Sequence, residues 1–83
     1  MKKMINDFTR FEFLEFARKI YRVDYPTDQE HIDAVFEFVR ISEHPKKSDL
    51  FFYPEPGKDG PEAIVSEVIS WRTANGKVGF KSD

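Results

Sequence analysis

The sequence contains no cysteine and no long apolar run. Without cysteine, neither a disulfide nor a thiolate metal site can reinforce the fold. No apolar stretch approaches the roughly 20 residues that a membrane-spanning helix needs. The basic N-terminal residues lead into Asn6 and Asp7 instead of an apolar signal core. We therefore expect a cytoplasmic protein that does not associate with membranes.

Residue patterns typical of catalytic sites are also missing. His31 and His44 are the only histidines, and neither a Gly-rich phosphate loop nor a nucleophile-elbow motif occurs. A metal site needs several ligands that converge, which His31 with Asp28 or His44 with Glu43 do not supply. We expect no enzyme, no metal and no cofactor. His44 is expected to end a helix, where its partial positive charge suits the helix dipole.

The length of 83 residues leaves room for one domain, and we predict that residues 1–83 form it. A chain this short buries only about 60% of the surface that its unfolded form exposes. The nine phenylalanines supply the bulk that such a small core needs.

Charge is divided along the chain although the net charge is only −2. Residues 1–23 carry six basic and three acidic groups. Residues 24–67 carry four basic and eleven acidic groups, and residues 68–83 carry three basic groups and one acidic group. An acidic middle argues against direct nucleic-acid binding and suits a basic protein partner. A solvent-exposed acidic face is the simpler interpretation of the same pattern.

Capping patterns predict the first two helices. Thr9 with Glu12, and Thr27 with Glu30, have the spacing of a capping box. Phe8 before the first cap and Phe13 after it can form a hydrophobic staple. The first helix should fade over residues 21–24, and the second should run to residue 42 or 43.

Two further helices are expected. Residues 48–54 are bounded by Ser48 or Asp49, which can cap a helical turn, and by Pro54, which ends it. Pro61 suits the first position of a last long helix that Asn75-Gly76 closes. The fold class is therefore all-α, a four-helix bundle with a very short third helix.

The second helix carries more apolar surface than a core needs. At about 100° per residue, Ala34, Phe38 and Ile41 form one stripe, and His31 separates it from a second. The members of the second stripe are Ile32, Val35, Phe36 and Val39. Together the stripes cover roughly 220°, about twice the arc that faces a core. Either the helix is deeply buried, or one stripe packs inward and the second faces a partner.

The aromatic turn indicates a binding surface too. Phe51, Phe52 and Tyr53 are consecutive, so they cannot all point inward. At least one should be exposed, and exposed aromatic side chains often anchor protein partners. Leu50 is the residue of this segment that we expect to reach the core.

Several motifs in order resemble the immunity proteins of colicin- and pyocin-type nuclease bacteriocins. They are Ile5–Thr9 with Glu12-Phe13-Leu14, Ser42–Pro45, Ser48–Pro54, Trp71–Lys77 and Gly79-Phe80-Lys81. The resemblance spans essentially the whole chain. It implies a cytoplasmic inhibitor, a monomer when free, that binds the nuclease domain of its cognate bacteriocin and so protects the producing cell.

The resemblance also implies a divided site. A shared anchor on the third helix comprises Ser48, Asp49, Phe52, Tyr53 and Pro54. Specificity positions on the second helix comprise Asp28, His31, Ile32, Val35, Phe36 and Val39. In nuclease inhibitors of this kind the immunity protein sits on an exosite beside the catalytic centre and blocks DNA by sterics and negative charge.

Two departures from the family pattern point to an unusually apolar cognate interface. Phe52 replaces the usual tyrosine, and Val39 stands where relatives often carry a carboxylate. The leading hypothesis is inhibition of an HNH-type DNase, with an RNase toxin as the open alternative. A small acidic helical carrier or regulatory module is the alternative from another class, because Ser48-Asp49-Leu50 resembles, in changed order, the attachment site of acyl carrier proteins.

Overall fold

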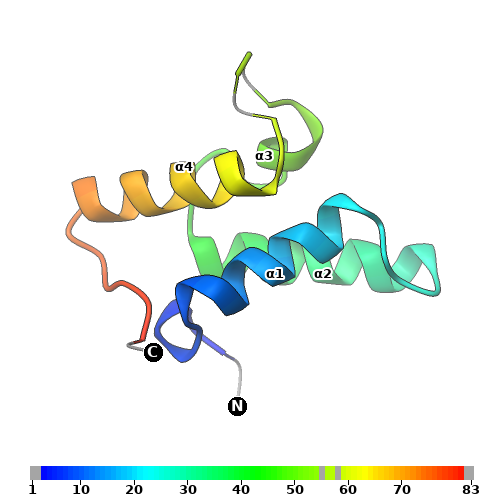
Figure 1. Ribbon diagram of the computed structural model, residues 1–83, viewed down its shortest axis with the longest axis horizontal. Coiled ribbons are helices and arrows are strands. Elements are labelled where there is room, and N and C mark those ends of the chain that lie inside the picture. Colours follow the sequence, from blue (N-terminus) through cyan, green and yellow to red (C-terminus); the bar gives the residue numbers. More distant parts are fainter. Residues whose placement is uncertain (1–2, 55, 58, 82–83) are drawn as a thin grey trace.

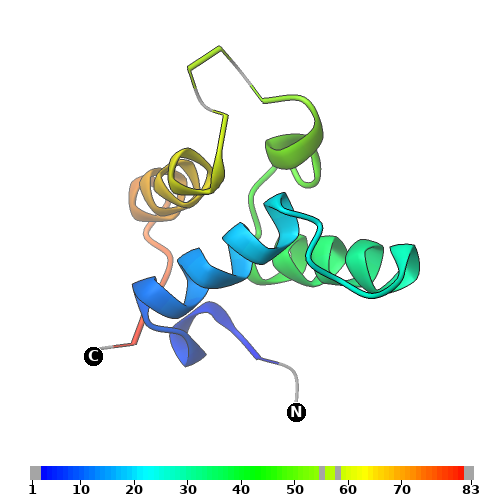
Figure 2. The ribbon, with the colours of Figure 1, turned by 45° about the vertical axis from the view of Figure 1, so that its right-hand side comes forward.

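The computed structural model describes residues 3–54, 56–57 and 59–81. In this part of the chain it is all-helical, with three long α-helices, one very short one and a 3₁₀ turn at Ile5–Asp7. The α-helices are α1 (Arg10–Tyr21), α2 (Asp28–Ser42), α3 (Asp49–Phe52) and α4 (Pro61–Ala74). Helix α1 packs against both α2 and α4. Short α3 lies beside the C-terminal end of α1 in both views (Figures 1 and 2). The predicted fold class is confirmed.

Local sequence signals begin α1 as predicted. The Thr9 hydroxyl accepts the N–H of Glu12 at 3.1 Å, and the Glu12 carboxylate accepts the N–H of Thr9 at 2.8 Å. The Phe8 ring contacts the Phe13 ring edge-to-face, with centroids 5.7 Å apart. The capping box and the hydrophobic staple are both confirmed.

The ends of α2 and α4 agree with those predicted from the sequence, except for the N-terminal cap of α2. Helix α4 begins at Pro61 and its C-cap is Asn75, as predicted. At the start of α2 the Thr27 hydroxyl accepts the N–H of Glu30 at 3.2 Å. The Glu30 carboxylate accepts from the same hydroxyl at 3.2 Å instead of completing the predicted capping box.

The core is built around stacked aromatic rings. Phe13 of α1 stacks on Phe38 of α2 with ring centroids 4.6 Å apart, and Phe51 meets Phe38 edge-on at 5.0 Å. Leu50 is buried, as expected. The buried apolar residues come from every helix and from the 3₁₀ turn: Ile5, Phe13, Ala17, Ile20, Val35, Phe38, Ile41, Leu50, Ile64, Val65 and Val68.

The phase of α2 differs from the sequence analysis at Val35. This residue is only 3% exposed, so it belongs to the core and not to an outward stripe. Val35, Phe38 and Ile41 are all buried, and they succeed one another at intervals of three residues. The core-facing arc therefore covers the first predicted stripe and takes one residue, Val35, from the second.

Arg72 joins the C-terminal end of α2 to α4 and to the tail. Its guanidinium is buried and donates to the carbonyl oxygens of Ser42 and Val78, each at 3.0 Å, and to the Glu43 carboxylate at 3.0 Å. A buried charge is tolerated because its donors are paired in this way. Sequence reasoning placed Arg72 on α4 but did not identify this network.

Candidate functional site

The α3 segment is a tight continuation of the turn that follows α2. The N–H groups of Asp49 and Tyr53 donate to the carbonyls of Lys46 and Asp49, at 3.0 and 2.9 Å. Ser48 has helical backbone angles and makes no side-chain cap, so of the two predicted caps, Ser48 or Asp49, the one at Ser48 is wrong. The preceding turn supplies the start of α3 instead. Pro54 follows, and it has no N–H with which to continue the helix.

The aromatic residues of α3 are divided between core and surface. Phe51 packs against Phe38, whereas Phe52 is 55% exposed and Tyr53 is 78% exposed. The prediction that at least one aromatic side chain is exposed is confirmed. Asp49 is also exposed, while Ser48 and Pro54 are half-buried. The residues predicted as an anchor therefore form a mainly exposed aromatic ridge with a carboxylate at its side.

The second predicted part of the site lies on α2. Asp28, Ile32 and Phe36 are exposed, and Phe36 has 64% of its surface accessible. Val39 is half-buried and packs against the core. His31 is half-buried as well, and its Nε2 atom lies 3.0 Å from the carbonyl oxygen of Ile20. Of the predicted stripe, Ile32 and Phe36 give the apolar surface that a partner can reach.

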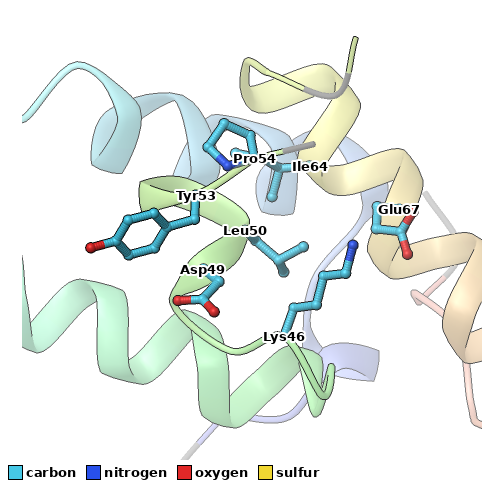
Figure 3. Close-up of a pocket in the computed structure, with 7 residues that line it drawn as sticks. All are labelled: Lys46, Asp49, Leu50, Tyr53, Pro54, Ile64 and Glu67. Carbon is cyan, nitrogen blue, oxygen red and sulfur yellow. The ribbon is translucent and has the colours of Figure 1, made fainter. Parts of the chain in front are cut away.

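A narrow pocket separates α3 from α4 (Figure 3). Its lining residues are Lys46, Asp49, Leu50, Tyr53, Pro54, Ile64 and Glu67. The Tyr53 ring points away from the pocket, and the Lys46 side chain extends towards Glu67. The cavity volume of about 10 Å³ is at the lower limit for a single water molecule. It is therefore a packing seam that supports α3, too small for a ligand.

His44 holds the turn that leads into α3. It is 3% exposed; its Nδ1 atom accepts the N–H of Lys46 at 3.1 Å, and its Nε2 atom lies 3.0 Å from Glu67 Oε2. The expected role of His44 at the helix dipole is replaced by this buried pairing with α4. Nothing in the sequence signals it, because Glu67 lies 23 residues further along the chain.

The site has an acidic character but no metal-binding cluster. Exposed carboxylates flank it at Asp28, Asp33 and Asp49. Among the described residues, no group of three His, Cys, Asp or Glu side chains could hold a metal ion. In the same part of the chain, no helix is long and apolar enough to cross a bilayer. The arrangement offers exposed aromatic and aliphatic side chains with carboxylates around them, which suits a basic protein partner.

Comparison with known proteins gives a family and close relatives. The sequence pattern of the family described as colicin immunity protein / pyocin immunity protein matches residues 5–74. The pyocin-S2 immunity protein of Pseudomonas aeruginosa is 45% identical, over 99% of this chain and 99% of its own length. The pyocin-S1 immunity protein of the same species has the same identity and coverage.

Two solved structures share the fold. One is the mutant nuclease domain of pyocin S8 with its cognate immunity protein; the TM-score is 0.89 at 32% identity, over 96% of this chain and 99% of the matched chain. The other is the pyocin AP41 DNase–immunity complex; the TM-score is 0.86 at 37% identity, over 99% and 100% of the two chains.

Proposed function

The chain belongs to the colicin and pyocin immunity protein family, and on that premise we propose that it binds and inhibits the nuclease domain of one cognate bacteriocin. Inhibition by a bound protein requires a stable surface and no catalytic group. The chain is accordingly proposed to be an inhibitor and not an enzyme, acting as one cytoplasmic domain and as a monomer when free.

The observation that carries the proposal is the exposed aromatic ridge on α3. Phe52 and Tyr53 expose most of their surface to water although the core is rich in other aromatic residues. Large aromatic side chains held on a rigid turn lose little conformational freedom when a partner covers them. Solved structures of immunity proteins with nuclease domains share this fold and support the same kind of partner.

Partner choice is proposed to reside on α2. Ile32 and Phe36 present an apolar surface, and Asp28 adds a carboxylate at the helix start. Val39 adds a half-buried apolar edge to this surface. Such a face discriminates by shape, because a charged partner residue placed against it would lose its hydration without gaining an ion pair. His31 borders this face, and Val35 supports it from the core.

The proposed target is a metal-dependent DNase of the HNH type. A DNA-binding nuclease surface is positively charged, and the middle of this chain is acidic. Asp49 and Pro54 extend the anchor, so that the α2–α3 face could cover an exosite beside the catalytic centre. DNA would then be excluded by bulk and by negative charge, with the nuclease active site left intact.

The test is a DNA-cleavage assay with the nuclease domain of the bacteriocin encoded beside this chain's gene. A stoichiometric amount of the chain should abolish cleavage, and the nuclease domains of pyocins S8 and AP41 serve as non-cognate comparisons. The same mixture is assayed on RNA, which identifies an RNase target. Undiminished cleavage of both substrates at an excess of the chain would overturn the proposal.

A further inference from the structure

Helix α1 ends in a conformation that valine disfavours. The N–H of Val23 donates to the carbonyl of Ile20, and the N–H of Asp24 donates to that of Lys19, each at 3.0 Å. This is the hydrogen-bond pattern of a Schellman motif, whose left-handed residue is usually glycine or asparagine. Val23 occupies that position with a φ of 54°. A β-branched side chain is a genuine outlier there.

The valine side chain also contributes little to the core. Val23 is 54% exposed, so the fold accepts both a strained backbone and an apolar surface at one residue. Glycine or asparagine would remove both costs and keep the hydrogen bonds of the motif. Strained residues of this kind gather at functional surfaces, so the surroundings of Val23 are a candidate binding surface.

Val23 forms one wall of a surface hollow between the end of α1, the start of α2 and α3. The lining residues are Ile20, Tyr21, Val23, His31, Phe51 and Phe52. The hollow has a volume of about 190 Å³, several times the roughly 30 Å³ that a water molecule takes up in the liquid. Figures 1 and 2 both place the end of α1 beside α3.

The lining is apolar and aromatic apart from His31 and the Tyr21 hydroxyl. The His31 Nε2 atom is already engaged by the carbonyl of Ile20, and the Tyr21 hydroxyl donates to Asp59 at 2.9 Å. The His31 Nε2 atom and the Tyr21 hydroxyl are thus occupied, and most of the surface that faces the hollow is carbon. His31 and Phe52 also belong to the two halves of the proposed binding site, so the hollow joins them.

We propose that this hollow is a third part of the nuclease-binding surface and receives an apolar side chain of the nuclease domain, with Val23 as a specificity-determining wall. The inference rests on the proposed function, because it needs the nuclease as its partner. The continuity of the hollow with the α2 and α3 surfaces, and its uncharged lining, favour an apolar side chain over a lysine or arginine.

The test is the substitution Val23→Asn, which suits the left-handed conformation and makes the wall polar. We expect the midpoint of thermal unfolding to stay the same or rise. The dissociation constant for the nuclease domain encoded beside the gene should increase about tenfold, as for truncation of a buried interface side chain. Val23→Gly, which removes the wall without making it polar, should also increase the dissociation constant.

The matched control is Val78→Asn. Val78 is a similarly exposed valine, 61% accessible, but it lies in the C-terminal tail and does not line the hollow. The same chemical change there should leave the dissociation constant unchanged.

The outcomes separate this inference from the proposed function. If the wild-type chain binds and Val23→Asn and Val23→Gly bind equally tightly, the inference is overturned while the function stands. If Val78→Asn weakens binding as much as Val23→Asn, the effect is not local and the inference is also overturned. If the wild-type chain does not bind, both the function and the inference fail.

Discussion

His44 Nε2 lies 3.0 Å from the Glu67 carboxylate and connects the turn before α3 to α4. Because His44 Nδ1 accepts the N–H of Lys46, the proton of the neutral ring is on Nε2 and is donated to Glu67. The imidazole is buried, so both of its nitrogens need these partners. One side chain of α4 thus helps to position the turn that carries the exposed aromatic ridge.

Glu67→Ala should therefore destabilise the fold more than Glu67→Gln. Alanine leaves the buried His44 N–H without a partner, which costs about 1–3 kcal/mol, whereas the glutamine oxygen can still accept it. The free energy of unfolding, measured by urea titration of the two variants and the wild type, decides this. Equal losses in both variants would mean that the carboxylate charge matters here and the hydrogen bond does not.

Tyr53→Ala should weaken nuclease binding by several kcal/mol, as loss of a central aromatic anchor can. Its stability should change little, because the side chain is 78% exposed in the isolated chain. Surface plasmon resonance with the nuclease domain gives the affinity, and thermal unfolding gives the stability. Tyr53→Phe separates the ring from the hydroxyl. Normal binding by the alanine variant would remove Tyr53 from the anchor.

Val35 and Phe36 are adjacent on α2, but Val35 is buried and Phe36 is exposed. Their alanine variants therefore form a matched pair. Val35→Ala should cost about 1–3 kcal/mol of stability, because it leaves space in the core. Phe36→Ala should leave stability nearly unchanged and alter the ratio of affinities for cognate and non-cognate nuclease domains. Urea titration and competition binding measure the two effects. A stability loss at Phe36 as large as that at Val35 would contradict the assignment of the two faces.

Glu43 should make the fold sensitive to acid. Its hydrogen bond with Arg72 at 3.0 Å, aided by Lys77, lowers the pKa of the Glu43 carboxyl below its ordinary value of 4.5. A lowered pKa in the folded state means that the ionised carboxylate stabilises the fold above pH 4.5. This contribution is lost as the pH falls through the lower folded value.

The comparison variant for this prediction is Glu43→Gln. The difference in the free energy of unfolding between wild type and variant should be constant near neutral pH and shrink below pH 4.5. A difference that does not depend on pH between 7 and 3 would show that the ionised carboxylate adds nothing to the Arg72 network.

The sequence by itself determined the elements and their class. Capping boxes and staples involve residues three to five apart, so Thr9, Glu12 and Phe8 act through bonds and contacts that form wherever that helix forms. Proline and glycine act on their own backbone angles, which is why the start at Pro61 was predictable. The residues of the aromatic turn were predictable too, since consecutive side chains on one turn cannot share a core.

Only the tertiary structure decided which side chains are buried and which residues of different segments contact one another. The burial of Val35 depends on where α1 and α4 lie around α2, because helical periodicity gives relative angles on a helix but no direction to the core. The pairing of His44 with Glu67 depends on the packing of α4 against the turn before α3. The hollow at Val23 needs three separate elements to meet. Each is a contact between segments far apart in the chain, and such contacts are set by packing as a whole and leave no local signal in the sequence.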